Sequence, residues 1–349
     1  MGIEPASMTA VFCHNAPDRT AETWKDQLGP FASREFAVSD AARGIAKAVA
    51  EIAASRREDV SPPASEHGLD IFPTTREAHR ALARHWRRAE AKWEQAEAAD
   101  EAVAAAKRRG IDARGVAQSA RAARAKAIAS SEQTERSESA RDRARSALDL
   151  FGPDGRLNDR ARAESVIAAA VVDLTGPDWA KVRNPLSDPR SLAVLDRMHR
   201  RLETAEPRRA WREALAWRWW LRHCQPKPSG PITDLIPAVG RGGASNGEEQ
   251  ASYDRVAAVL WDTYRASSAV ECLNRVLRMQ QSRHRRMRQP MPDLERLDWN
   301  CRPFRSGPRQ DAGPYPALGL DLPTFDFWEV VHTDPARLTQ ELSTQGNAE

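Results

Sequence analysis

A single acid in an otherwise apolar, Asn- and Arg-edged stretch is the strongest sign of chemistry in this 349-residue chain. Residues 265–278 read Arg-Ala-Ser-Ser-Ala-Val-Glu-Cys-Leu-Asn-Arg-Val-Leu-Arg, and Glu271 is the only carboxylate among them. Asn274 and Arg278 follow three and seven residues later, so on a helix all three share one face. Such a face is suited to orienting a metal ion or DNA. The alternative for Asn274 is an ordinary polar residue at the surface.

A dense basic cluster comes directly after this stretch. Residues 283–288 read Arg-His-Arg-Arg-Met-Arg, in a chain whose formal net charge is only +4. Clusters of this kind suit the phosphate backbone of nucleic acids, whereas the alternative is the solvated end of a helix. We expect DNA contacts from six side chains: Asn274, Arg278, Arg283, Arg285, Arg286 and Arg288.

A second candidate acid ends a predicted strand near the amino terminus. Residues 8–14 predict a strand and residues 18–28 a helix. Residues 34–40 predict another strand, which ends in Asp40, and residues 41–52 predict an amphipathic helix. The order is therefore strand, helix, strand, helix, with an acid at the carboxyl end of a strand.

The middle of the chain is predicted to be helical. Residues 76–109 form one long helix that ends at Gly110, with apolar side chains at alternating four- and three-residue steps, as in a helical hairpin or coiled coil. Asp100 places a charge in this seam. A second helix, residues 113–150, is expected to pack back antiparallel to the first. The apolar seam positions are Leu82, Trp86, Ala89, Trp93 and Ala96.

Further helices are predicted to start near Asn158, Asp178, Asp188 and Pro207. The last of them contains Trp211, Trp217, Trp219 and Trp220; we expect core packing, and a stacking platform for nucleic acid is the alternative. Residues 225–250 predict a flexible linker that includes the Gly-rich run at residues 240–243. Helices over residues 251–265 and 294–304 follow, and residues 313–320 predict turns.

Composition excludes several classes of site. No run approaches the ~20 apolar residues of a membrane span, so we expect a soluble protein without a membrane partner. The four cysteines lie far apart, which argues against a zinc knuckle and a disulfide framework and favours a reducing cytoplasm. Four scattered histidines do not pair with a second His or Cys at metal-ligand spacing; they are His67, His79, His85 and His223. The cysteines are Cys13, Cys224, Cys272 and Cys301.

Four parts of the chain together resemble the DDE transposases of insertion sequences. They are residues 2–8, residues 36–44 around Asp40, the Ser-Ser-x-x-Glu-x-x-Asn run at residues 267–274, and the tail from Trp-Asn-x-x-Pro-Phe at residues 299–304 through residue 319. The resemblance covers nearly the whole chain. It implies that Asp40 is the second metal-binding acid and Glu271 the third.

The resemblance also implies the fold and the chemistry. We expect a mostly α fold with a minor α/β part, in which a partial RNase-H-like core is interrupted by an all-helical insertion with a long antiparallel hairpin. Converging carboxylates would hold Mg²⁺ or Mn²⁺, because hard cations take oxygen ligands, for phosphoryl transfer on DNA. The expected divisions are 1–60 (amino-terminal core), 76–224 (insertion), 225–250 (linker) and 251–349 (carboxyl-terminal core).

The chain departs from the family at the first acid. That acid belongs on an opening strand ahead of residues 8–14, where Glu4 is the only acid. We therefore expect a copy truncated at the amino terminus, with impaired DNA cleavage and strand transfer, because losing one member of a catalytic unit removes most activity. The alternative is a non-catalytic remnant that binds DNA or oligomerises. A coiled-coil protein unrelated to DNA would leave the Glu271 segment unexplained.

The same reading names partners and a location. The partners are transposon ends and target DNA, and a homodimer is the further assembly that the reading allows. The expected location is the bacterial cytoplasm, with association to the nucleoid when the protein is bound to DNA.

Overall fold

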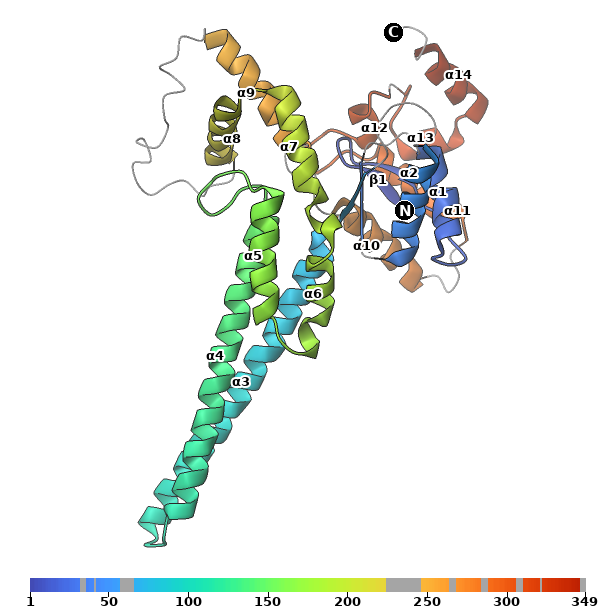
Figure 1. Ribbon diagram of the computed structural model, residues 1–349. Helices are drawn as coiled ribbons and strands as arrows, with labels where there is room; N and C mark the ends of the chain where they lie inside the picture. The colour runs from blue at the N-terminus through green and yellow to red at the C-terminus, as the bar shows by residue number, and fades with distance from the viewer. Residues whose placement is uncertain are drawn as a thin grey trace. The chain divides into compact units, whose positions relative to one another are not determined.

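The computed structural model describes residues 1–31, 36–40, 42–56, 66–223, 246–263, 268–283, 288–305, 310–320 and 322–345. The side chains of some helical residues, Glu271 and Arg283 among them, lie outside this description. The described part contains fourteen α-helices and four short strands, so the predicted mostly helical fold is confirmed. The chain divides into two compact units (Figure 1). Unit 1 joins residues 1–67 with 266–349, and unit 2 comprises residues 68–265.

Unit 1 begins with a β-hairpin. Strand β1 (Gly2–Glu4) pairs antiparallel with β2 (Thr9–Phe12), with Glu4 opposite Thr9. The Glu4 carboxylate accepts hydrogen bonds from the backbone N–H groups of Ala6 and Ser7, at 2.8 and 2.7 Å. The carboxylate therefore closes the turn, in which Met8 adopts a positive φ of 66°.

Strand β2 contributes to two apolar clusters. Phe12 packs in a cluster with Leu28 of α1 (Ala21–Leu28) and Val49 of α2 (Arg43–Arg56). Ala10 packs in a second cluster, whose other buried members are Cys13, Leu273 and Leu277. Because the last two come from α10 (Ser268–Arg283), the core of unit 1 unites both ends of the chain.

Helix α11 (Pro290–Cys301) lines β2 with polar side chains. Asn300 is 1% exposed; its side-chain oxygen accepts from the Ala10 N–H at 2.8 Å, and its Nδ2 donates to the Ala10 carbonyl at 3.1 Å. Trp299 Nε1 donates to the Met8 carbonyl at 2.9 Å, and Arg296 donates to the Val11 carbonyl at 3.2 Å. These side chains hydrogen-bond to backbone groups of β2, and of Met8 just before it, that the pairing of β2 with β1 leaves without a partner.

A second sheet has two strands as well. Strand β3 (Phe36–Ser39) pairs with β4 (Glu66–Leu69). The predicted strands at residues 8–14 and 34–40 are present in shortened form, whereas β4 was not predicted. Within the described residues the four strands form two separate sheets, and no single larger sheet is seen.

Helix α2 approaches the segment before α1 closely. A Cβ atom at Gly44 would lie 2.1 Å from the Arg19 carbonyl oxygen. Any side chain there would force backbone to move, so the glycine that ends the 36–44 segment is needed for packing. The carboxyl-terminal tail adds α12 (Pro314–Ala317), α13 (Phe327–His332) and α14 (Pro335–Gln345). The last two were not predicted.

Unit 2 is dominated by the predicted antiparallel hairpin of α3 (Ile71–Arg108) and α4 (Arg114–Leu148). Helix α3 starts five residues before the predicted position 76, because Asp70 caps it by accepting from the Phe72 N–H at 2.8 Å. Small residues fill the seam: Ala89, Ala96 and Ala127 are each at most 1% exposed. Asp100, the charge in the seam, lies 3.9 Å from Arg124 of α4.

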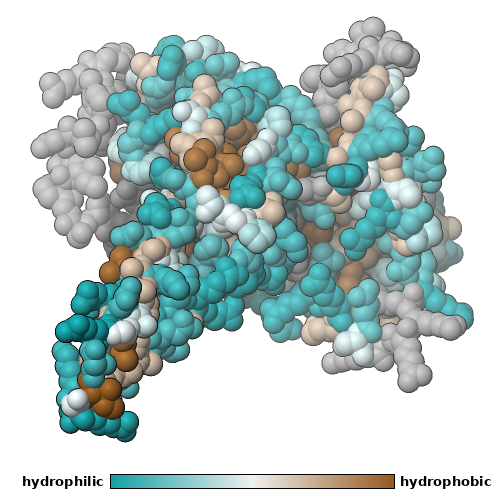
Figure 2. All heavy atoms as spheres, turned by 60° about the horizontal axis from the view of Figure 1, so that its bottom comes forward, coloured by the Kyte–Doolittle hydropathy of each residue, from teal (hydrophilic) through white to brown (hydrophobic). Residues whose placement is uncertain are grey.

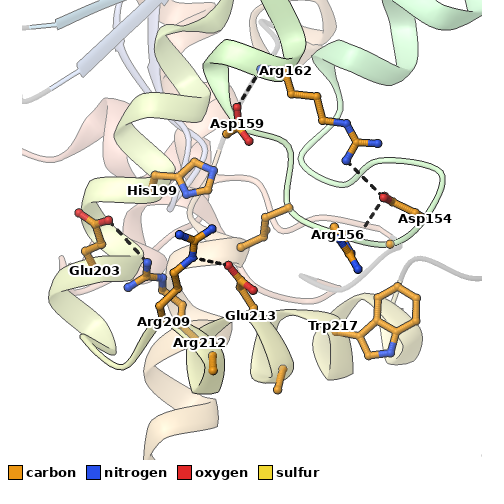
Figure 3. Close-up of a pocket in the computed structure, with 14 residues that line it drawn as sticks. Asp154, Arg156, Asp159, Arg162, His199, Glu203, Arg209, Arg212, Glu213 and Trp217 are labelled. Carbon is orange, nitrogen blue, oxygen red and sulfur yellow. Dashed lines mark hydrogen bonds and ion pairs between the residues drawn. The ribbon is translucent and has the colours of Figure 1, made fainter. Parts of the chain in front are cut away.

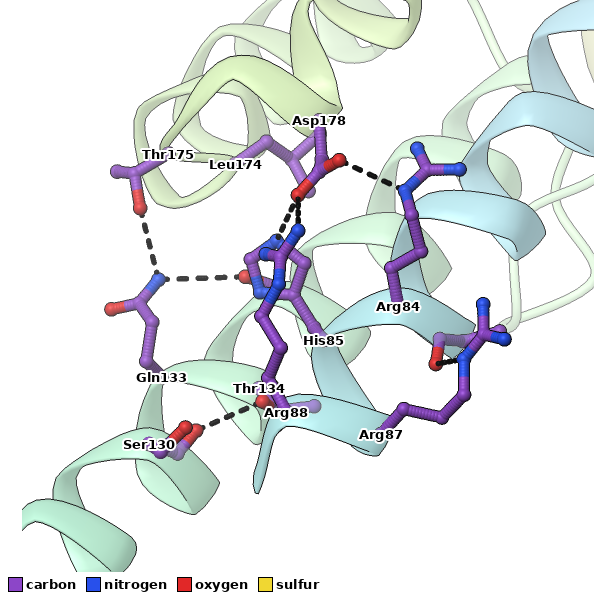
Figure 4. A network of polar contacts seen from close by, with 12 residues as sticks. Arg84, His85, Arg87, Arg88, Ser130, Gln133, Thr134, Leu174, Thr175 and Asp178 are labelled. Atoms are coloured by element: carbon purple, nitrogen blue, oxygen red, sulfur yellow. Dashed lines mark hydrogen bonds and ion pairs between the residues drawn. The ribbon is translucent and has the colours of Figure 1, made fainter. Parts of the chain in front are cut away.

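A polar network anchors the next segment to the hairpin (Figure 4). After α5 (Arg160–Asp173), the short η2 (Pro177–Trp179) carries Asp178, which pairs with Arg84 at 2.8 Å and Arg88 at 2.5 Å. Buried Trp179 packs beside the His85 ring. Burial lowers the pKa of His85, and the nearby Arg88 charge acts in the same direction. His85 is therefore a neutral packing residue at neutral pH.

The remaining helices form a second group in unit 2. Helix α6 (Ala180–Leu186) packs on α3, and η3 (Pro189–Leu192) leads into α7 (Ala193–Ala205). Helix α9 (Asn246–Trp261) packs against α7 and α8 (Arg209–His223). Residues 246–261 thus form a helix of unit 2, whereas the sequence predicted a linker up to residue 250 and a carboxyl-terminal core from residue 251. The rest of the predicted linker, residues 225–245, lies outside the described residues, and so does Cys224.

The tryptophans of α8 are only partly core residues. Trp219 is 6% exposed and stacks on Phe151 with ring centroids 6.0 Å apart, as expected for core packing. Trp217 and Trp220 stack on each other at 4.9 Å and are half-buried. Trp261 of α9 meets Trp219 edge to face and is 56% exposed. The cluster therefore closes one end of unit 2 and leaves some aromatic surface exposed.

Glu206 joins α7, α8 and α9. It is 1% exposed, and its two carboxylate oxygens accept from Arg208 Nε and Nη2 at 2.8 and 2.9 Å. Hydrogen bonds from Arg208 lower the pKa of Glu206 to about 2, and Ser252 of α9 contributes. Arg255 of α9 lies 3.9 Å from the same carboxylate. One buried acid thereby holds three helix segments together.

Replacing Glu206 with Gln is expected to lower the free energy of unfolding by about 2 kcal/mol at neutral pH. The shift of the Glu206 pKa from 4.5 to about 2 corresponds to roughly 3 kcal/mol of folding free energy, at ~1.36 kcal/mol per pKa unit. Solvent screening of the half-exposed Arg208 reduces this contribution. Because the folded pKa is depressed, this stability is present above pH ~4.5 and is lost as the pH falls toward 2. Urea unfolding of the parent and the variant between pH 7 and pH 3 should show their free energies of unfolding converge as the pH falls.

The matched control is Glu213→Gln. Glu213 pairs with Arg209 at 2.9 Å, but the two side chains are 56% and 83% exposed. An exposed pair of this kind contributes about 0 to 1 kcal/mol. Equal losses for the two variants would contradict the role of Glu206.

Candidate nucleic-acid interface

Helix α10 is amphipathic, and its apolar side fixes it in the core. Leu273 and Leu277 are 0% and 7% exposed and pack in the cluster that contains Ala10 and Cys13. Trp299 of α11 packs against the same cluster. The helix therefore has a defined orientation in unit 1, set by residues one turn apart.

The outer side of α10 carries unpaired positive charge. Arg275 and Arg278 are both exposed, and neither forms an ion pair with a residue that the structure describes. Met279, beside them, is 51% exposed. Position 275 lies two residues after Leu273 and position 278 five after it, so both arginines stand on the side away from the buried leucines. Two guanidinium groups are thus presented to solvent from a rigid support.

The other predicted contacts are described only in part. Asn274 is half-buried on α10, and Arg288 is exposed just before α11. Glu271 and Arg283 lie in the first and last turns of α10 by backbone, but their side chains lie outside the description. Arg285 and Arg286 lie outside it altogether. Arg278 and Arg288 are therefore the two predicted arginines whose exposure can be stated.

Asp40 follows β3 directly and is exposed. Its Oδ1 accepts from the Ala42 N–H at 3.1 Å, a turn that leads into α2. The Ser39 hydroxyl donates to the Asp40 carbonyl at 3.0 Å and lies 2.7 Å from Nε2 of His67 on β4. The carboxylate thus stands at a strand end, although its turn also serves the start of α2.

Both predicted acids belong to unit 1, although 231 positions separate 40 from 271. Within the described side chains, His, Cys, Asp and Glu form no group of three that would hold a metal ion. Asp40 is a hard oxygen donor of the kind that Mg²⁺ and Mn²⁺ take. The thiols near β2 are different: burial raises the pKa of Cys13, and raises that of Cys301 to about 11, so both thiols are protonated at neutral pH.

Unit 2 contains a large cavity, about 1120 Å³ in volume, between the segment at residues 154–162 and helices α7 and α8 (Figure 3). Its walls are charged, but most of its arginines already have carboxylate partners. Three such pairs are Arg162 with Asp154 at 3.3 Å, Arg209 with Glu213 at 2.9 Å and Arg212 with Glu203 at 3.5 Å. The cavity therefore offers less free positive charge than α10.

Sequence reasoning missed two features of this interface. Arg275 stands four residues after Glu271 and three before Arg278, so helical spacing alone would have added it to the predicted face. Asn300 was quoted only as part of a tail motif, and its pairing with Ala10 required the fold. No local signal in the sequence marks that pairing.

Among the described residues, none of the helices has the length and apolar composition needed to cross a lipid bilayer. Comparison of the chain with protein-family models, with curated proteins and with solved structures finds no match.

Proposed function

We propose that the chain binds DNA through unit 1, on the outer side of α10. The observation that carries the proposal is the pair of exposed arginines, Arg275 and Arg278, without an ion-pair partner among the described residues. Leu273 and Leu277 hold the helix from the other side. Cations on a fixed support lose less conformational entropy on binding than cations on a free segment.

The geometry of α10 suits a duplex. An α-helix with its side chains is about 10–12 Å across, close to the ~12 Å width of the major groove. Arginine recognises phosphate oxygens in a bidentate manner. Contacts to phosphate position a protein on DNA, and contacts to base edges give sequence preference. Asn274, half-buried beside the arginines, is the nearby candidate for a base contact.

The activity that we propose on this DNA is transposase-type cleavage and strand transfer by an RNase-H-like core, impaired because the first of the three acids is missing. Asp40 and Glu271 would hold Mg²⁺ or Mn²⁺. Bound divalent ions in such a site supply an activated oxygen nucleophile and stabilise the leaving oxygen. Support comes from the placement of both acids in unit 1, from the strand-end position of Asp40, and from the resemblance of residues 36–44 and 267–274.

A non-catalytic DNA-binding remnant is the second candidate. One observation favours it: Asp40 already accepts a hydrogen bond that starts α2. This is a sufficient structural role for an acid at a strand end. The remnant would occupy DNA ends through the same arginines, without cleavage.

Salt-dependent binding tests the proposal. Fluorescence anisotropy with a labelled 30-base-pair duplex is expected to show affinity that falls steeply between about 50 and 200 mM KCl. In the double variant Arg275→Gln, Arg278→Gln, the slope of log K against log salt should decrease by about 2, because each phosphate contact contributes about 0.9.

The matched control removes the same charge elsewhere in unit 1. Arg19 and Arg305 are exposed and form no ion pair with a described residue. The double variant Arg19→Gln, Arg305→Gln should keep the parental slope. Absence of duplex binding by the folded parent, or an equal loss in the control, would remove α10 as a DNA-binding surface.

A further inference from the structure

The free end of the α3–α4 hairpin is a cluster of positive charge. Lys107 and Arg108 form the last turn of α3, and Arg109 is its C-cap. All three side chains are exposed, and none of them forms an ion pair with a residue that the structure describes. Asp112 is the acid in the turn, and it lies 3.9 Å from Arg114, with both side chains mostly exposed.

The same turn presents an apolar side chain to solvent. Ile111 is 59% exposed and follows Gly110, whose φ of 66° allows the tight reversal. Figure 2 shows brown spheres among teal ones at this end of the hairpin. Ile111, exposed at the end of the helical pair, does not contribute to the core of unit 2. Its placement suits contact with another molecule.

The length and packing of the hairpin place this turn far from the other end of α3. At about 1.5 Å per residue, the 38 residues of α3 span about 57 Å. Ala89, Ala96 and Ala127 close the seam tightly, and Trp93 Nε1 donates to the Ser131 hydroxyl at 2.9 Å. Close packing of this kind resists bending. The turn is therefore carried on a stiff arm.

Charge and shape together select the partner. Cations at the carboxyl end of a helix interact favourably with its dipole, which accounts for the three cations that end α3 but not for the exposed Ile111 beyond it. A lipid surface requires an apolar helix face rich in Trp, Phe or Leu, and the turn offers one isoleucine. A DNA duplex fits both the cations and the exposed isoleucine, because it offers phosphates outside its grooves and apolar base edges within them. Proteins that bind the minor groove insert Ile between base steps.

We propose that the hairpin tip, defined as Lys107, Arg108, Arg109 and Ile111, is a second DNA-contact surface. The inference rests on the proposed DNA-binding function and extends it to unit 2. The cations contact phosphates without sequence preference, and Ile111 contacts the sugar or base edges of the groove. The tip thus engages the duplex at a point distinct from α10.

The test compares two triple variants that remove equal charge. Lys107→Gln, Arg108→Gln, Arg109→Gln removes the tip cations. Lys92→Gln, Arg121→Gln, Lys126→Gln removes three exposed cations of the hairpin shaft that form no ion pair with a described residue. On the labelled 30-base-pair duplex, the tip variant should decrease the slope of log K against log salt by about 2 to 3, and the shaft variant should keep it.

Ile111→Ala separates the apolar contact from the charge. It should weaken duplex binding about fivefold at each salt concentration, because less apolar surface is buried, and it should leave the slope unchanged. Circular dichroism checks that the variants keep the parental helix content.

The possible failures are distinguishable. A tip variant with the parental slope, or a shaft variant with an equal loss, would overturn the tip inference and leave the α10 proposal intact. A folded parent that binds no duplex would overturn both. Vesicles of phosphatidylglycerol provide the third arm. If tip substitutions abolish vesicle binding but leave duplex binding unchanged, the tip is a lipid contact and the DNA inference is wrong.

Discussion

Replacing Glu271 with Gln is expected to abolish metal-dependent nicking of supercoiled plasmid, with a loss of at least about 100-fold. Gln keeps the size of the side chain but removes the charge that a hard cation needs. The assay measures the conversion of supercoiled to open-circular DNA in about 5–10 mM Mn²⁺. This concentration is chosen to saturate a weak carboxylate site. Asp40→Asn should have the same effect, because both acids are assigned to one metal site.

Binding distinguishes a catalytic loss from a folding loss. Glu271→Gln and Asp40→Asn should keep the parental duplex affinity and salt slope, because neither removes a cation. Glu213→Gln, a change to an exposed acid in unit 2, is the control for nicking. A parent that binds DNA but never nicks it would favour the non-catalytic alternative. Nicking that persists in Glu271→Gln would exclude Glu271 from the site.

The second large effect is expected at Asn300. Asn300→Ala should lower the free energy of unfolding by about 3 kcal/mol, because the buried N–H and C=O of Ala10 would each lose a partner at about 1–3 kcal/mol per group. The amide of Asn300 acts as a substitute for one residue of a neighbouring strand. Urea unfolding at neutral pH measures the loss.

Three further variants test the role of Asn300. Asn300→Asp keeps the acceptor for the Ala10 N–H but places a charge against the Ala10 carbonyl, so it should destabilise at least as much as Ala. Trp299→Phe removes the hydrogen bond to the Met8 carbonyl and part of the ring that packs on the Ala10 cluster, and it should cost about 1–2 kcal/mol. Asn184→Ala, at an exposed position, should change stability by less than about 0.5 kcal/mol. Tolerance of Asn300→Asp would contradict the pairing with Ala10.

The long hairpin was the element most readily predicted, because its pattern is local. Alanines at seam spacing and Gly110 at the reversal act within one or two helical turns, whereas the start that Asp70 caps was not predicted. Even Asp100, which breaks the apolar seam, is explained by a partner on the antiparallel helix. Residues 8–14 and 34–40 gave strands for the same reason.

Features that depend on tertiary contacts were not predictable in this way. Strand β4 reads Glu-His-Gly-Leu, with no β-branched residue, and it is a strand only because it pairs with β3. Helix α9 was assigned to the wrong unit, since nothing local shows that it packs on α7 and α8. At the site, Asp40 and the positions of α10 follow from pattern, whereas the burial of Glu206 and Asn300 follows only from the assembled fold.

The construction of unit 1 from two distant segments has a consequence for synthesis. The first 67 residues emerge from the ribosome long before residues 266–349, which supply Leu273, Leu277 and Asn300. Until then, Ala10 and Cys13 lack most of their apolar neighbours, and β2 has unsatisfied backbone groups along its side, a template for pairing with other chains. The helices of unit 2, formed by local contacts, fold sooner. The nascent chain therefore passes through an interval in which aggregation competes with completion of unit 1.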